Sequence, residues 1–180
     1  MRTDRAPGVP VKEDGMERSA ARRIIDLDGA ARERALPTLN EGFVGIYRWH
    51  AKRMLGRVPN VRAAELGGEI VGVALLDRPA PDVGYVYYLS VGGRHRREGI
   101  GGALLDDALE RFRHDGTKVV YAAVEGDNRA SLALFRSRGF RVVERDERSY
   151  RDGGLGPKGL RSRMWVVSGE QVLGIRFGPP

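Results

Sequence analysis

The sequence of 180 residues contains no cysteine and only three histidines: His50, His95 and His114. Without cysteine there are no disulfides, no thiolate nucleophile and no zinc site that needs sulfur. The histidines are scattered, and no spacing of His, Asp and Glu places metal ligands on one face, so we expect no metal. The lack of cysteine also agrees with the cytoplasmic location that we expect.

Long apolar runs are absent as well. No segment approaches the roughly 20 apolar residues of a membrane helix, and the first residues are polar and broken by prolines, unlike a secretory signal. We therefore expect no membrane association. The length predicts one domain, with residues 1–20 as a flexible leader, 21–168 as the domain and 169–180 as a C-terminal tail; Met16 is a second candidate start.

Lysine is scarce, since only four of the 31 basic residues are lysine and the rest are arginine. The net charge is 31 − 24 = +7, and the isoelectric point is about 10.1. An arginine excess of this kind is also typical of a GC-rich genome. Nucleic-acid binding is one hypothesis for the charge, but neither interleaved aromatic residues nor a recognised module supports it, and we expect no nucleic-acid partner.

The hydrophobic pattern alternates between strand and helix periods, which predicts an α/β fold: a single-domain mixed β-sheet flanked by helices. Gly67-Gly68 lies between two β-rich runs and predicts a hairpin. Asp28 is expected to cap the first helix, and Ile46, Trp49 and Met54 to form the apolar stripe of the second. Residues 172–177 either add a strand or lie unpacked. Strands are expected at 22–27, 61–66, 70–76, 85–91, 118–124, 140–144 and 164–167, and helices at 30–39, 43–55, 103–114 and 128–137.

One segment carries the signature of a phosphate site. The strand that ends at Val91 runs into a basic turn with Gly99, Gly101 and Gly102, and a helix follows at once. A helix N-terminus presents N–H groups without intrahelical partners and a partial positive charge, and glycine lets a ligand approach the backbone. The dinucleotide pattern G-x-G-x-x-G fails at Leu104, and no P-loop motif occurs.

The turn has the form [QR]-x-x-G-x-[GA], from Arg96 to Gly101. Downstream, Asn128 opens a helix that closes on Gly139-Phe140. With these two motifs in this order, the chain resembles the GNAT superfamily of acyl-CoA-dependent N-acyltransferases, from about residue 22 to residue 167.

The resemblance implies acetyl-CoA as cosubstrate and assigns roles to residues. Backbone groups of Leu89 and Val91 would bind the pantetheine arm, and the Leu89 N–H would polarise the thioester carbonyl as an oxyanion donor. Asn128 would touch the cofactor near its pantetheine end. The pyrophosphate would be held by the segment made of Arg96, Arg97, Glu98, Gly99, Ile100, Gly101 and Gly102.

The chain departs from one subfamily pattern. Ribosomal-protein N-terminal acetyltransferases of this superfamily use a Glu five residues before the Asn as base and a Tyr seven residues after it as acid, where this chain has Ala123 and Phe135. Neither can move a proton. The candidate substitutes are water, Glu125 at a strand end, Tyr150 in the long connection, and the strand tyrosines Tyr85, Tyr87 and Tyr88.

These observations predict direct transfer of an acetyl group to an amine in a ternary complex, because the chain has no thiolate for an acyl-enzyme route. A rival hypothesis is a CoA-binding sensor or pseudoenzyme that has lost proton transfer. A peptide N-terminus, a polyamine, an amino acid and an aminoglycoside all stay open as acceptors, as does a homodimer. The positive charge argues against a strongly cationic small acceptor, because the cleft would need its own acidic lining.

Overall fold

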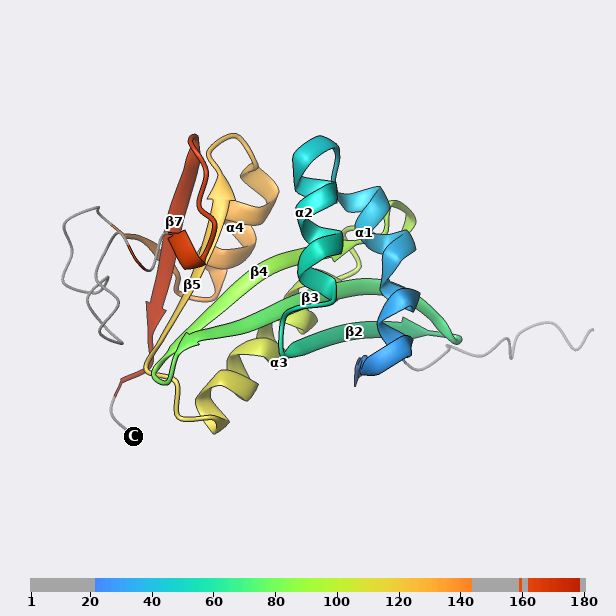
Figure 1. The fold of residues 1–180 in the computed structure, drawn as a ribbon, viewed down its shortest axis with the longest axis horizontal. Helices are drawn as coiled ribbons and strands as arrows, with labels where there is room; N and C mark the ends of the chain where they lie inside the picture. Colours follow the sequence, from blue (N-terminus) through green and yellow to red (C-terminus); the bar gives the residue numbers. More distant parts are fainter. Residues whose placement is uncertain (1–21, 144–158, 160–161, 179–180) are drawn as a thin grey trace, which may run out of the picture.

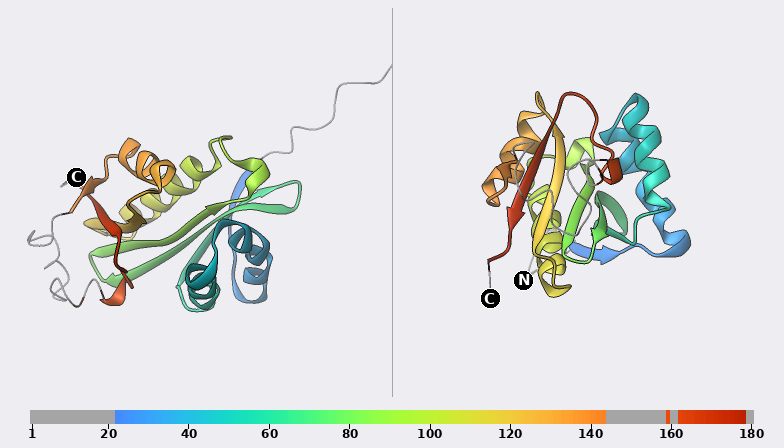
Figure 2. Two further views of the ribbon diagram at one scale, coloured as in Figure 1. Left: turned by 90° about the horizontal axis from the view of Figure 1, so that it is seen from above. Right: turned by 60° about the vertical axis from the view of Figure 1, so that its left-hand side comes forward.

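The computed structural model describes residues 22–143, 159 and 162–178. In this part of the chain, seven strands form one mixed sheet, and helices cover both of its faces (Figures 1 and 2). The predicted α/β fold is therefore confirmed. None of the described helices is both long and apolar enough to cross a membrane.

The fold begins with β1 (Arg23–Asp26), which confirms the first expected strand. Next come a 3-10 helix, η1 (Gly29–Ala35), and the helix α1 (Leu36–Gly42). The prediction of one continuous helix over residues 30–39 with Asp28 as its cap is wrong, because the helix type changes at residue 36 and the Asp28 side chain makes no capping hydrogen bond.

Pro37 explains the interruption. It lies in the first turn of α1. Within a continuous α-helix its ring would clash with the carbonyl group four residues earlier, whereas the first turn tolerates proline because its N–H groups have no intrahelical partner. The α-helix therefore starts again at this point.

Helix α2 (Gly45–Leu55) buries a different face from the expected one. Ile46 and Trp49 are 63% and 59% exposed, and the buried residues are His50, Ala51 and Leu55. The stripe of Ile46, Trp49 and Met54 was therefore the wrong one. The buried face of α2 includes the polar residue His50. A search for apolar residues at helical spacing does not detect such a residue.

The chain then forms the antiparallel strands β2 (Asn60–Leu66), β3 (Glu69–Ala80) and β4 (Val83–Val91). Gly67 and Gly68 join β2 to β3 with φ of 58° and 88°, so the predicted hairpin is confirmed. Left-handed φ values of this kind suit glycine, which has no Cβ to clash.

The second half of the sheet is flanked by α3 (Ile100–His114) and α4 (Arg129–Ser137), with β5 (Val119–Glu125) between them in the chain. Strand β4 pairs with β5 in parallel, the only parallel pairing among the described strands. A parallel pair needs a crossover connection, and α3 supplies it.

The last strands are β6 (Arg141–Val142) and β7 (Glu170–Arg176). Residues 172–177, left open by the sequence, thus contribute to a strand, and the sheet order is β1-β2-β3-β4-β5-β7-β6. The strand expected at 164–167 is wrong, because those residues form a turn and a loop. Met164, 1% exposed, instead packs into a core cluster with β4 and β5 side chains, and a short apolar run cannot distinguish these two outcomes.

The helices lie on opposite faces of the sheet, α1 and α2 on one and α3 and α4 on the other (Figure 2). Each pair covers its own core. The core under α1 and α2 includes Leu39, Leu55, Val73 and Leu75, and the core under α3 and α4 includes Leu104, Leu105, Phe112 and Phe135.

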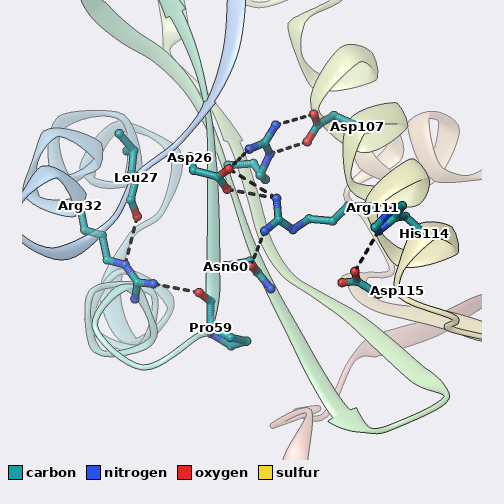
Figure 3. Close-up of polar contacts among 10 residues, drawn as sticks. Asp26, Leu27, Arg32, Pro59, Asn60, Asp107, Arg111, His114 and Asp115 are labelled. Atoms are coloured by element: carbon teal, nitrogen blue, oxygen red, sulfur yellow. Dashed lines mark hydrogen bonds and ion pairs between the residues drawn. The ribbon is translucent and has the colours of Figure 1, made fainter.

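An ion network fastens α3 to the edge of the sheet (Figure 3). The guanidinium of Arg62 on β2 donates two hydrogen bonds of 2.7 Å to the Asp107 carboxylate on α3 and forms an ion pair of 2.7 Å with Asp26 on β1. Arg111, one helical turn further along α3, also reaches Asp26, at 3.3 Å. Because the Arg62 side chain is only 12% exposed, water cannot easily replace these contacts.

We expect Arg62→Met to lower the free energy of unfolding by about 2 kcal/mol, because it leaves two partly buried carboxylates without their shared cation. Arg23→Met is the matched control: Arg23 pairs with Glu65 at 2.8 Å but is 71% exposed, so its loss should be under about 0.5 kcal/mol. Urea denaturation of both variants measures the difference, and equal effects would contradict it.

Candidate active site

The two central strands part inside the sheet. The β4–β5 pairing ends at Val86 and Ala122, although β4 runs on to Val91. Figure 1 shows the two strands together at one end and well apart at the other. Beyond Val86, this side of β4 therefore faces no described strand.

The backbone of Leu89 and Val91 points into the gap. The Gly92 N–H donates to the Val71 carbonyl on β3 at 2.9 Å. Because successive N–H groups of a strand point to opposite sides, the N–H groups of Leu89 and Val91 face away from β3. The side chain of Arg96 confirms this direction, since its Nε donates to the Val91 carbonyl at 3.3 Å.

The glycine turn brings a helix N-terminus to the same gap. A short 3-10 turn, η2 (Gly93–His95), leads to Arg97 and Gly99, whose φ values of 66° and 77° are left-handed. Helix α3 begins at Ile100, three residues earlier than expected, so Gly101 and Gly102 lie in its first turn. The N–H groups of a first turn have no intrahelical partner, and alternating left- and right-handed residues form an anion-binding nest.

The gap opens into a cavity of about 600 Å³ between β4, the glycine turn and α4. A Cβ on Gly101 would lie 3.4 Å from the Leu134 side chain and 3.5 Å from that of Leu89, so the narrow part of this cavity has no room for a longer side chain. Of the residues expected to bind cofactor, all but Glu98 line it: Leu89, Val91, Arg96, Arg97, Gly99, Ile100, Gly101, Gly102 and Asn128.

Glu98 is not among the residues that line the cavity. Its carboxylate lies 3.4 Å from His95, and its carbonyl oxygen accepts a hydrogen bond of 3.0 Å from Arg22. Its side chain and its backbone thus both contribute contacts that hold the turn.

Asn128 caps α4 and lines the cavity. Its side-chain oxygen accepts a hydrogen bond of 3.1 Å from the Ser131 N–H, as expected of an N-cap. The side-chain NH₂ group is not used by this cap, so one residue can both begin the helix and bind a ligand.

A second, smaller cavity of about 80 Å³ adjoins the first. The two share the lining residues Phe43, Leu89, Asn128 and Ser131. Leu89 therefore lies where the cavities meet. The remaining lining is mostly aromatic and acidic: Tyr47, Tyr85, Tyr87, Tyr88, Phe135, Trp165, Glu125 and Glu170.

A β-bulge explains why three strand tyrosines border one cavity. Simple alternation would put Tyr85 and Tyr87 on one face and Tyr88 on the other. The β3–β4 register, however, shifts between Leu75, which pairs with Tyr88, and Leu76, which pairs with Val86. Tyr87 is the extra residue, and a bulge of this kind redirects side chains.

The Tyr47 hydroxyl lies near the carboxylates of Glu125 and Glu170. Burial, together with the two negative charges, raises the pKa of Tyr47 to about 12. The phenol therefore stays neutral at physiological pH and can donate to a carboxylate. The two carboxylates lie on β5 and β7, as register partners directly opposite one another.

Trp165 lines the cavity, and His50 of α2 packs against it. Their rings stack with centroids 3.7 Å apart, and the His50 Nδ1 lies 2.8 Å from the Tyr88 hydroxyl. Burial, followed by the positive charge of Arg53, lowers the pKa of His50 to about 4. Tyr87 donates a hydrogen bond to the Arg163 carbonyl and so holds the same segment from β4.

The sequence analysis missed three residues that line this cavity, Tyr47, Trp165 and Glu170, and also His50, which packs against Trp165. The spacing Tyr47, Ala51, Leu55 was a helical stripe that could have identified the face of α2. Nothing in the sequence pattern indicated Trp165 or Glu170. Tyr150, a predicted candidate, lies outside the described residues, and Ala123 and Phe135 occupy the cavity region without a group that can carry a proton.

The chain matches the Acetyltransferase (GNAT) family over residues 26–140, more than half its length. It belongs to this family. Among curated GNAT relatives it is 39% identical over 116 residues to the N-alpha-acetyltransferase RimI of Mycobacterium tuberculosis, covering 63% of this chain and 62% of the relative. It is also 32% identical over 98 residues to an L-methionine sulfoximine/L-methionine sulfone acetyltransferase of Pseudomonas aeruginosa, covering 52% and 57%. The chain thus spans less than two thirds of these relatives.

Solved GNAT structures share the fold. The ribosomal-protein-S18-alanine N-acetyltransferase of Escherichia coli superposes with a TM-score of 0.66 at 16% identity, over 89% of this chain and 96% of that one. A GNAT family acetyltransferase of Elizabethkingia anophelis with acetyl-CoA bound also gives 0.66 at 16% identity, over 87% and 98%. Among the described residues there is no group of three or more His, Cys, Asp or Glu side chains that could hold a metal ion.

We expect Gly101→Glu to weaken acetyl-CoA binding by at least about 100-fold, because a carboxylate would enter the narrow cavity beside a site built for phosphate. Ala133→Glu, on the exposed side of α4, adds the same charge outside the cavity and should bind normally. Calorimetry measures both, and unchanged affinity of the Gly101 variant would refute the phosphate assignment.

The low pKa of His50 predicts acid sensitivity. Its ordinary value is 6.5 and its folded value about 4, so between these pH values the unfolded chain binds more protons and stability falls as pH falls. By pH 4 the loss should be about 3 kcal/mol. His50→Gln should remove this part of the pH dependence in denaturation curves, and parallel profiles for the two proteins would contradict the assignment.

Proposed function

We propose that this protein transfers the acetyl group of acetyl-CoA directly to an amine within a ternary complex. The observation that carries the proposal is the meeting of two cavities at Leu89, where β4 has left β5. One cavity suits an anionic, elongated ligand, and the other suits a small polar group. Two substrates bound in this way would react without the entropic cost of a bimolecular encounter.

The larger cavity fits acetyl-CoA. The N–H groups at the start of α3, with the charges of Arg96 and Arg97, would hold the pyrophosphate. The backbone groups of Leu89 and Val91 that face the gap would bind the pantetheine arm, and the Leu89 N–H would stabilise negative charge on the thioester oxygen. When bound, the cosubstrate supplies an activated acyl thioester.

Glu125 is our candidate for the base. An amine of lysine type has a pKa of about 10.4, so it must lose a proton before it attacks. Glu125 lines the small cavity and interacts with the Tyr47 hydroxyl. Glu125 would accept the amine proton, and Tyr47 would help to orient the nitrogen. These two residues would take the roles of the subfamily's Glu and Tyr, whose positions hold Ala123 and Phe135 in this chain. Tyr150 stays a second candidate acid.

The names of the relatives divide the acceptors into two classes. RimI is named for N-alpha-acetylation, and the relative from Pseudomonas is named for modified amino acids. We propose an amine acceptor for this chain, with a peptide N-terminus and a small amine both included. A cytoplasmic location and a homodimer stay predictions from the sequence.

Direct transfer predicts that initial rates measured at several concentrations of both substrates give intersecting reciprocal plots, with release of one CoA for each amide formed. Protein quenched after incubation with acetyl-CoA alone should carry no acetyl group, because the chain has no thiolate. Parallel plots with acetylated protein would overturn direct transfer. Tight acetyl-CoA binding without turnover on a broad amine panel would instead favour the sensor.

A further inference from the structure

Helix α1 touches the unpaired end of β4 at the residues that form the larger cavity. Beyond Val86, one side of β4 faces no described strand, so its position depends on β3 and on the helices that cover it. Ser90 lies between Leu89 and Val91, the two residues proposed to bind the pantetheine arm. Because side chains alternate along a strand, Ser90 faces α1, whereas Leu89 and Val91 pack against the core under α3.

A buried chain of hydrogen bonds links β3, α1 and β4. The Thr38 hydroxyl of α1 donates to the Ile70 carbonyl of β3 at 2.7 Å, and the Ser90 hydroxyl of β4 donates to the Thr38 carbonyl at 3.0 Å. Thr38 and Ser90 are only 3% and 4% exposed, so water cannot easily replace these bonds, and breaking one would leave a buried polar group without a partner. The helix is thus tied to both strands.

Gly42, the last residue of α1, brings the helix into direct contact with Ser90. A Cβ on Gly42 would lie 1.9 Å from the Ser90 Oγ and 2.9 Å from the Ser90 Cβ. Rotation of the hydroxyl could relieve the first contact, but the second requires that α1 or β4 move. Gly42 therefore permits a spacing between helix and strand that no other residue would allow.

The preceding residue of α1 makes a second contact, with the glycine turn. The Glu41 carboxylate accepts a hydrogen bond of 2.9 Å from the N–H of Gly93, the first residue of η2. This short 3-10 turn leads into the segment proposed to hold the pyrophosphate. A carboxylate near that segment would repel phosphate, so the contribution of Glu41 lies in the position of the turn and not in its charge.

We propose that Ser90 and Glu41 are positioning residues for acetyl-CoA, with α1 as the element that sets the position of both halves of its site. The inference rests on the proposed function and adds to it. Ser90 fixes the β4 backbone that would bind the pantetheine arm and polarise the thioester, and Glu41 fixes the turn that would hold the phosphates. Both side chains act through the backbone groups of their neighbours.

Gly42→Ala tests the contact between α1 and β4, because its methyl group would displace Ser90. Two ligands separate the halves of the site: acetyl-CoA, and 3′-phosphoadenosine 5′-diphosphate, which has the pyrophosphate without the pantetheine arm. Calorimetry should show acetyl-CoA bound at least about 30-fold more weakly and the diphosphate less than about threefold more weakly, because only the pantetheine arm needs the Leu89 and Val91 backbone.

Gly84→Ala is the matched control on the same strand. A Cβ on Gly84 would lie 2.8 Å from the Phe112 ring, an equally tight contact, but at the end of β4 that pairs with β5. This variant should be less stable to denaturant than the wild-type protein, and the folded protein should bind both ligands with unchanged affinity.

Ser90→Ala removes the hydroxyl that a methyl group on Gly42 would strike. Alone, it should weaken acetyl-CoA binding about threefold, because β4 loses its bond to the Thr38 carbonyl. Combined with Gly42→Ala, it removes the contact of 1.9 Å and leaves that of 2.9 Å. The double variant should therefore bind acetyl-CoA more tightly than Gly42→Ala alone, whereas two independent defects would add.

Glu41→Ala and Glu41→Gln remove the same charge, and only glutamine keeps an oxygen that can accept from the Gly93 N–H. Glu41→Ala should therefore bind both ligands about threefold more weakly than Glu41→Gln. Glu41→Gln should bind them at least as tightly as the wild-type protein, because a negative charge near the phosphates is gone. Glu41 is exposed, so both variants should fold.

Equal losses for the two ligands in Gly42→Ala, or no recovery in the double variant, would overturn the role of Ser90. If Gly42→Ala does not fold, Ser90→Ala decides, and equal effects on the two ligands would again overturn it. Equal affinities of the two Glu41 variants would overturn the role of Glu41. A wild-type protein that does not bind acetyl-CoA, or binds it without turnover on any amine, would instead contradict the proposed function, so the two failures are distinguishable.

Discussion

The end of the β4–β5 pairing at Val86 and Ala122 is the constraint on which the rest of the site depends. Inside a sheet, a strand normally satisfies its N–H and C=O groups on both sides, and buried backbone groups without partners are costly. Here β4 continues for five residues without β5. The backbone donors and acceptors of this part of β4 therefore face a cavity, and they can bind a ligand there without the help of a side chain.

Two sets of contacts hold the elements around the unpaired end of β4 in place. Helix α3 packs across β2, β3 and β4 and is tied to the sheet by Arg62 and Asp107, so its N-terminus is fixed relative to Leu89. On the other side, the segment that carries Trp165 is held by stacking on His50 and by the hydrogen bond from Tyr87. The larger cavity is thus built mainly on regular elements, whereas the smaller cavity depends on a loop, the kind of segment that carries functional variation.

The sequence predicted the parts of the site that depend on local backbone chemistry. Glycines before a helix predict a tight turn, and an asparagine at a helix start predicts an N-cap. The structure has the Gly99–Gly102 segment at the start of α3 and Asn128 as the N-cap of α4. It could not predict what depends on register. A one-residue bulge at Tyr87 changes which tyrosines share a cavity, and the pairing of β7 with β5 brings Glu170 beside Glu125 from 45 positions away. Residues 164–167 were misread because an apolar run fits a strand and a packed turn equally well.

The charge that bears on the site is local and differs between the two cavities. The chain carries a net charge of +7, but several arginines are engaged structurally, as Arg32 is with four backbone carbonyls. What matters at the site is local: Arg96 and Arg97 beside a helix N-terminus, and Glu125 and Glu170 beyond Leu89. An anionic donor in the larger cavity and an amine in the smaller one would meet only at the common boundary of the two cavities, at Leu89. An amine that enters the smaller cavity as an ammonium ion must lose a proton before its nitrogen can attack, and Glu125, which lines that cavity, is the proposed acceptor of the proton.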